Sequence, residues 1–280
     1  MPRDWDARTY DRVADPMTRW GAAVLDRLPL AGDERVLDAG CGSGRVTELL
    51  AERLPRGRVV ALDGSSSMIE AARERLAPFG DRIEYVVADL GEPIPLDAPV
   101  DVVFSTATFH WVPDHDALVA NLAAVLRPGG WLVAQCGGIG NIASVQRVLS
   151  TIGDGWLGPV HFETPMATVG RLDGAGFVDI ECWLTDEPTW FEPGERSRPT
   201  FGRSSWAPTW NGCRPTSTPR SSIRSRPGCR SRSSIMSGST SSPAGQAVET
   251  CRARTPRDRL TSRRWATPSG RSAVSNSCTG

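Results

Sequence analysis

Acidic residues and glycines gather where an apolar segment of the chain is expected to end as a β-strand. The segment runs into Asp38 and is followed by glycines at alternate positions, Gly40, Gly42 and Gly44. Glycine lacks a Cβ, so it adopts backbone angles closed to other residues and lets a ligand lie against bare main chain. The backbone N–H groups that open the following helix would face that ligand. The stretch therefore predicts a ligand-binding turn between a strand and a helix.

The glycine spacing bears on which ligand this turn would bind. A dinucleotide fingerprint has the form G-x-G-x-x-G, whereas here the third glycine comes one place early and Arg45 occupies the fingerprint position. The dinucleotide interpretation is weakened accordingly. Asp63 ends the next expected strand, and Asp89 follows the third. These acidic residues extend the pattern beyond the turn itself.

The pattern D-x-G-x-G-x-G, with Asp63 and Asp89 at their spacing, resembles the first motifs of class I S-adenosylmethionine-dependent methyltransferases. An L-R-P-G-G run at residues 126–130, followed by an apolar strand, is also typical of that family. The resemblance covers roughly residues 5–190. The run F-H-W-V-P-D-H at residues 109–115 most resembles the trans-aconitate 2-methyltransferase-like branch. A glycine turn in some other α/β protein is the alternative.

The resemblance implies a role for several residues around the cofactor S-adenosylmethionine. Asp63 would accept hydrogen bonds from the ribose hydroxyls, and Asp38 with the glycine turn would hold the methionine end. Asp89 would bind the adenine amino group and Met68 would pack on the ring, although Asp89 is alternatively a loop-capping carboxylate. The full predicted cofactor-binding set is Asp38, Ala39, Gly40, Cys41, Gly42, Gly44, Asp63, Gly64, Met68, Asp89, Leu90 and Ser105.

Three aromatic residues, Tyr10, His110 and Trp111, are predicted to line the substrate pocket. A histidine beside a crevice can act as a general base, which makes His110 the candidate; hydrogen bonding or packing is the alternative role. No catalytic residue is assigned, because a sulfonium methyl is already activated. A carboxylate acceptor is already a nucleophile, so holding it in line is most of the task.

Apolar strands and amphipathic helices alternate along residues 33–190. Strands are expected at residues 35–39, 58–62, 82–87, 100–105, 131–136 and 177–184. This order predicts an α/β fold with a Rossmann-like, doubly wound, mostly parallel sheet and helices on both faces. Ligands of such sheets bind at the carboxyl ends of the strands. Residues 1–32 are expected to form an N-terminal helical cap, in two pieces because Pro16 interrupts it.

The composition changes sharply near residue 196. Residues 1–195 hold 16 arginines and 30 acidic residues, whereas residues 196–280 hold 16 arginines and only two acidic residues. Residues 191–280 are rich in Ser, Arg, Pro and Thr and lack periodicity, so they are predicted to be a disordered tail. A basic nucleic-acid arm is the other interpretation.

A frameshift would explain this tail and remove the nucleic-acid interpretation. Read from the third base of a codon, residues 199–215 can encode an amphipathic helix and residues 230–246 an apolar strand. Class I methyltransferases have a seventh, antiparallel strand between the fifth and sixth. On this hypothesis that strand is missing from the chain, and the alternative function is S-adenosylmethionine binding with little or no catalysis.

The predicted function is methyl transfer from S-adenosylmethionine to a small-molecule acceptor, such as the carboxylate of trans-aconitate or a related acid. No apolar run could cross a bilayer and the N-terminus resembles no signal peptide, so a cytoplasmic location and no membrane partner are expected. No nucleic-acid partner is expected either, because the frameshift hypothesis removes the basic arm. Seven cysteines without a C-x-x-C predict reduced thiols and no metal site. The acceptor, the oligomeric state and the activity of the chain are left open.

Overall fold

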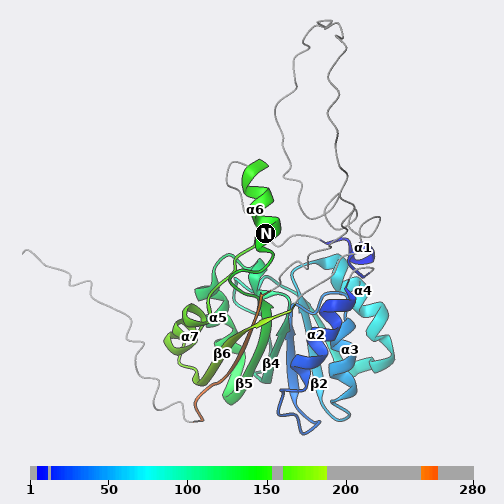
Figure 1. The fold of residues 1–280 in the computed structure, drawn as a ribbon. Coiled ribbons are helices and arrows are strands. Elements are labelled where there is room, and N and C mark those ends of the chain that lie inside the picture. The colour runs from blue at the N-terminus through cyan, green and yellow to red at the C-terminus, as the bar shows by residue number, and fades with distance from the viewer. Residues whose placement is uncertain (1–4, 12–13, 153–159, 188–246, 258–280) are drawn as a thin grey trace, which may run out of the picture.

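A computed structural model describes residues 5–11, 14–152, 160–187 and 247–257 (Figure 1). Their centre is a seven-stranded sheet in the order β3-β2-β1-β4-β5-β7-β6. The strands are β1 Arg35–Ala39, β2 Arg58–Asp63, β3 Ile83–Val87, β4 Val100–Thr106, β5 Leu126–Gly137, β6 Val178–Asp186 and β7 Ala247–Arg254. Strands β1 to β5 are parallel, and β7 runs antiparallel to both of its neighbours. The predicted mostly parallel sheet is confirmed.

The helices follow the predicted alternation. They are α1 Ala7–Asp11, α2 Asp15–Leu25, α3 Arg45–Glu52, α4 Ser66–Leu76, α5 His115–Val125, α6 Ala143–Ile152 and α7 Pro165–Gly174, with short 3₁₀ turns η1 Ala77–Arg82 and η2 Phe109–Trp111. Side-chain oxygens of Ser65, Asp114 and Thr164 cap α4, α5 and α7. The N-terminal segment forms two pieces, as predicted. Pro16 lies in the first turn of α2, where a missing N–H costs no hydrogen bond.

Two apolar cores lie on opposite faces of the sheet, because successive strand residues point to opposite sides. Leu37 belongs to the core shared with α5 and α7, while its neighbour Val36 belongs to the core shared with α2, α3 and α4. Both side chains are fully buried. Strands buried on both faces read as continuous apolar runs, which is why the sequence revealed them.

The seventh strand is present, which corrects the predicted boundaries and the predicted loss of a strand. Residues Ala247–Arg254, assigned from the sequence to a disordered tail, form β7 between β5 and β6. Val248 and Ala253 are buried there. The arginines made this strand look like part of a basic tail in the sequence. In the structure the Arg252 guanidinium stacks on Trp131, 4.3 Å from the centre of the ring.

The two segments of the frameshift hypothesis, residues 199–215 and 230–246, lie outside the described residues. The prediction of disorder for residues 191–246 and 258–280 likewise falls outside the described residues. Among the helices that the structure describes, none is both apolar and long enough to pass through a membrane.

Candidate functional site

The predicted site residues converge at the carboxyl ends of the parallel strands. The glycine turn follows β1, Asp63 is the last residue of β2, and η2 follows β4. Because β1 lies between β2 and β4, these three segments are neighbours at one edge of the sheet. This is the edge at which open α/β sheets bind ligands.

The glycine turn has the left-handed backbone that its sequence predicts, with φ of +88° at Gly40 and +55° at Gly42. Its amides, however, are used within the protein. Gly40 N and Cys41 N both donate to the Leu62 carbonyl oxygen, at 2.8 and 2.9 Å. Gly42 N donates to Asp63 Oδ2 at 2.9 Å. These three amides therefore tie β1 to β2, and the turn offers bare main chain to a ligand. That the N–H groups opening α3 face the ligand stays a prediction.

Asp63 joins the turn to the start of α4. Its Oδ1 accepts a hydrogen bond from Ser65 N at 2.9 Å, and its Oδ2 accepts the bond from Gly42. Burial raises the pKa of Asp63, while hydrogen bonds from the Ser65, Gly42 and Gly64 backbone act in the opposite direction. Each carboxylate oxygen has two lone pairs, so both retain capacity for a further donor.

Asp38 is a second carboxyl group at this edge and is only 2% exposed. It accepts a hydrogen bond from the Thr47 hydroxyl at 2.7 Å. Burial raises the pKa of Asp38 to about 7, with the Thr47 hydrogen bond opposing and the charge of Asp63 reinforcing the shift. Asp38 thus changes charge near neutral pH.

A cleft lies beside these groups. Its volume is about 40 Å³, and it is lined by Tyr10, Ala14, Met17, Thr18, Asp38, Gly40, Cys41, Gly42, Ser43, Arg45, Val46, Thr106 and Ala107. Of the predicted cofactor-binding set, Asp38, Gly40, Cys41 and Gly42 line it, and Tyr10 of the predicted substrate set lies with them. Part of the predicted cofactor-binding set and one predicted substrate residue, Tyr10, therefore line the same cavity.

Helix α1 covers the cleft and is fastened to the sheet edge. Trp5 N donates to Ser65 Oγ at 3.1 Å, and the Trp5 and Trp111 rings meet edge to face at 4.9 Å. Asp11 forms an ion pair with Arg75 at 2.8 Å. Burial raises the pKa of Tyr10 to about 12, with the charges of Asp63 and Asp11 adding to the shift. The N-terminal cap is thus part of the cleft wall.

Several predicted residues serve the scaffold around the cleft. Ser105 is fully buried and donates its hydroxyl to the Ala39 carbonyl at 2.6 Å, so it links β4 to β1. Asp89 Oδ1 accepts from Gly91 N at 3.0 Å, which is a turn-capping contact. Met68 and Leu90 are buried, 3% and 5% exposed. Contacts of Asp89 and Met68 with the adenine, and of Leu90 with the cofactor, remain predictions.

His110 lies in η2 as a neutral ring. Its Nδ1 accepts a hydrogen bond from Gly137 N at 3.1 Å, so the ring proton is carried by Nε2. Burial, with a smaller contribution from the nearby His115, lowers the pKa of His110 to about 3. The His110 ring packs 5.1 Å from the Trp111 ring and 5.8 Å from that of Phe162. Such a ring is a weak base and is suited to hydrogen bonding.

Sequence reasoning missed the partners that shape the cleft. Thr47, fully buried on α3, holds the Asp38 carboxyl, and Ala107 has a left-handed φ of +55° at the cleft wall. Alanine rarely adopts a positive φ, so an alanine in the sequence gives no indication of this backbone conformation. The D-x-G-x-G-x-G pattern specifies the turn but says nothing of the helix residue that hydrogen-bonds its first aspartate.

Comparison with known proteins decides the family. Residues 36–130 match a methyltransferase domain family. The chain is 36% identical to the trans-aconitate 2-methyltransferase of Methylobacterium nodulans over 182 residues, which are 65% of this chain and 67% of that protein. The chain belongs to the class I S-adenosylmethionine-dependent methyltransferases. The family predicted from the glycine turn is confirmed.

Other relatives of this methyltransferase match over a shorter region. The trans-aconitate 2-methyltransferase of Variovorax paradoxus is 41% identical over 132 residues, 47% of this chain and 49% of that protein. The chain spans about half the length of several such curated relatives. A structure of Haemonchus contortus phosphoethanolamine N-methyltransferase 2, with phosphomonomethylethanolamine and S-adenosylhomocysteine, superposes with a TM-score of 0.60. It covers 89% of this chain and 57% of that one at 16% identity, which shows a shared fold.

Proposed function

We propose that this methyltransferase transfers a methyl group from S-adenosylmethionine to a carboxylate of a small organic acid such as trans-aconitate. The observation that carries the proposal is the pair of buried carboxyl groups, Asp38 and Asp63, on either side of a glycine turn. The names of the relatives support the acceptor class. The cofactor would supply a methyl group on a positively charged sulfonium, ready for attack by a nucleophile.

The residues of the cleft fit this cofactor. Asp63 has lone pairs left for two vicinal ribose hydroxyls after its bonds to Gly42 and Ser65. Asp38, once ionised, attracts the ammonium group of the methionine end. A Cβ added at Gly42 would find no atom within 4 Å, so there is open space over the turn. Carboxylates and bare main chain thus face the polar parts of the nucleoside and amino acid.

Entry of the cofactor requires the cap to move. Pockets for molecules of this size usually have about 300–1,000 Å³, whereas the cleft beneath α1 has about 40 Å³. Tyr10 lines the cleft, and α1 with the preceding Trp5 is held by polar and ring contacts to Ser43, Arg45, Ser65, Ser67, Arg75 and Trp111. Displacement of this five-residue helix would break these contacts and is the step that opens the site.

A carboxylate acceptor suits the chemistry of η2. The acceptor oxygen is already a nucleophile, so no base is required. His110 stays neutral because its pKa is about 3, and its Nε2–H is a hydrogen-bond donor that can orient a carboxylate. His110 then positions the acceptor and takes no proton.

The experiment is a binding measurement followed by a transfer assay on the full chain. Calorimetry with S-adenosylmethionine is expected to show one site. A radiolabelled methyl group should then appear on trans-aconitate or a related acid, but not on the corresponding full methyl ester, in which every carboxylate is blocked. The presence of β7 between β5 and β6 supports catalysis, because loss of this strand was one of the reasons to expect none. Binding without transfer to any acid would contradict the proposed activity.

Cofactor affinity is expected to rise with pH because of Asp38. Its neutral form predominates below the pKa of about 7, whereas the ammonium of the cofactor favours the ionised form. Binding then includes loss of a proton, so affinity should fall by up to about tenfold per pH unit below 7 and level off above it. The measurement is calorimetry from about pH 5.5 to about pH 7.5.

Two variants separate Asp38 from other causes of this pH dependence. Asp38→Asn should bind weakly and lose the slope, since the amide does not titrate. Asp33→Asn, at an exposed aspartate before β1, should keep both the affinity and the slope. An equal slope in D38N and the unsubstituted protein would assign the effect to another group.

A further inference from the structure

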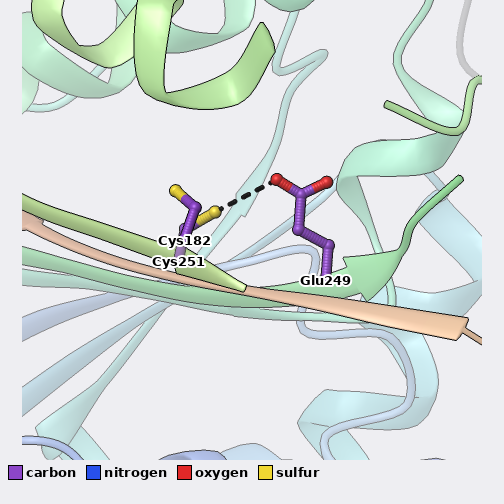
Figure 2. Close-up of side chains that lie close together, drawn as sticks. All are labelled: Cys182, Glu249 and Cys251. Atoms are coloured by element: carbon purple, nitrogen blue, oxygen red, sulfur yellow. Dashed lines mark hydrogen bonds between the residues drawn. The ribbon is translucent and has the colours of Figure 1, made fainter. Parts of the chain in front are cut away.

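Two thiols and one carboxylate form a cluster on the paired strands β6 and β7 (Figure 2), and none of the three lines the cofactor cleft. Cys182 and Cys251 are direct partners in the antiparallel ladder, and Glu249 lies two residues before Cys251 on the same face. The two Sγ atoms and a carboxylate oxygen lie within 4.8 Å of one another. Cys251 Sγ donates a hydrogen bond to Glu249 Oε1 at 3.4 Å. Three potential ligand atoms thus converge from two strands.

The cluster is enclosed, which makes its carboxylate unusual. Glu249 is 2% exposed and Cys251 is 7% exposed, whereas Cys182 is half-buried. A buried carboxylate is costly unless it is paired or coordinates a metal. Burial raises the pKa of Glu249, while hydrogen bonds from Thr168 and Cys251 oppose the shift. Buried thiols alone would be ordinary packing; the buried carboxylate beside them adds a ligand type that hard and borderline cations favour.

The arginine whose charge acts on Glu249 already pairs with two other acidic residues. Arg171 of α7, whose charge reaches Glu249, forms ion pairs with Glu163 at 3.0 Å and Asp116 at 3.1 Å. A second like charge, that of Glu163, adds to the upward shift of the Glu249 pKa. The local balance of charge therefore favours a cation at the cluster.

We propose that Cys182, Cys251 and Glu249 bind a thiophilic divalent cation such as Zn²⁺. Thiolate sulfur and carboxylate oxygen are regular zinc ligands, at about 2.3 and 2.1 Å, which places neighbouring ligand atoms of a tetrahedral site about 3.7 Å apart. The three atoms lie within 4.8 Å of one another, so on binding, side-chain rotation would have to draw them about 1 Å closer at most. Half-buried Cys182 leaves the fourth position to water.

Binding is balanced by release of protons. Each thiol loses its proton to solvent as its metal–sulfur bond forms, so two protons leave for each ion bound, and a third leaves when Glu249 is protonated beforehand. The ion would join β6 to a strand that returns from a distant part of the sequence. It would thereby hold β7 in place between β5 and β6.

The test is Co²⁺ binding to the full chain under a non-thiol reductant, in a C213S/C229S/C278S background that removes the cysteines outside the described residues. A tetrahedral site with two thiolates should give thiolate-to-cobalt charge-transfer absorption in the near ultraviolet and intense visible bands. Added Zn²⁺ should displace Co²⁺ and abolish both the charge-transfer absorption and the visible bands, and the titration should be complete at one Zn²⁺ ion per chain. Absence of the charge-transfer band would overturn the proposal.

Substitutions assign the ligands. C182S and C251S should remove the charge-transfer absorption, and E249Q should weaken Zn²⁺ binding at least about tenfold, as loss of even an outer-shell partner does. E181Q is the matched control, because Glu181 is exposed and neighbours Cys182 on the opposite face of β6. Bands that survive in folded C182S protein would overturn the assignment.

A stability measurement covers the case in which C251S fails to fold. Zn²⁺ should raise the melting temperature of the background protein and of E181Q. C182S should fold, because half-buried Cys182 tolerates serine, but should show no such rise, because it lacks one ligand. An equal rise in C182S would mean that the ion binds elsewhere.

Discussion

Replacing Asp63 by alanine is expected to weaken S-adenosylmethionine binding by about 3 kcal/mol, roughly a hundredfold in Kd. The carboxylate has two tasks that alanine cannot perform. It would accept hydrogen bonds from the ribose hydroxyls, and it accepts hydrogen bonds from the backbone N–H groups of Gly42 and Ser65, at 2.9 Å each. Loss of those bonds leaves two donors unpaired at the end of β2, which loosens the glycine turn as well.

Calorimetry with graded variants tests this expectation. Asp63→Asn retains one acceptor oxygen and should lose less affinity than D63A. Asp33→Ala, an exposed position before β1, should bind as the unsubstituted protein does. Circular dichroism of D63A establishes that the sheet has formed. Undiminished affinity in folded D63A protein would place the ribose away from β2.

Buried strands were predictable from the sequence because their signal is local. Val36 and Leu37 face different cores, so both must be apolar, and the run is visible without knowledge of its neighbours. The glycine turn was equally visible, because its left-handed backbone restricts the residue type. The fold and the edge expected to bind ligands followed from these two signals, and the family followed once the spacing to Asp63 and Asp89 was added.

β7 could not be predicted because its stability comes from its neighbours. Arg252 and Arg254 look like parts of a basic tail, yet Arg252 stacks on Trp131 and Arg254 pairs with Asp179 of β6. Intrinsic strand preference is weak compared with what the two adjacent strands impose. The frameshift hypothesis treated this missing local signal as a missing strand.

The thiol cluster escaped prediction for a similar reason. Metal sites are recognised in sequences by short spacings such as C-x-x-C. Cys182 and Cys251 meet only because β6 and β7 pair in register, and Glu249 joins them through the two-residue period of its strand. The pairing of distant strands, which no local motif encodes, creates the site.

Replacing Gly40 by alanine is expected to destabilise the fold by about 3 kcal/mol and to abolish cofactor binding. Two effects combine. The backbone at Gly40 has φ of +88°, which costs an L-residue about 1–2 kcal/mol. A Cβ there would also lie 2.1 Å from Thr108 Oγ1 and 2.3 Å from Thr108 Cγ2, so the loop after β4 must move. Urea unfolding and calorimetry measure the two losses.

Gly42 provides the control, because a Cβ at Gly42 would meet nothing within 4 Å despite its φ of +55°. G42A should therefore show only the backbone cost, about 1 kcal/mol. The collision at Gly40 can be tested by a double-mutant cycle with Thr108→Gly, which removes the three Thr108 atoms that lie nearest the new methyl group. G40A and T108G should be less destabilising together than the sum of their separate effects, by about 1 kcal/mol or more. Simple additivity would show that backbone strain alone makes glycine necessary at the turn where β1 meets β4.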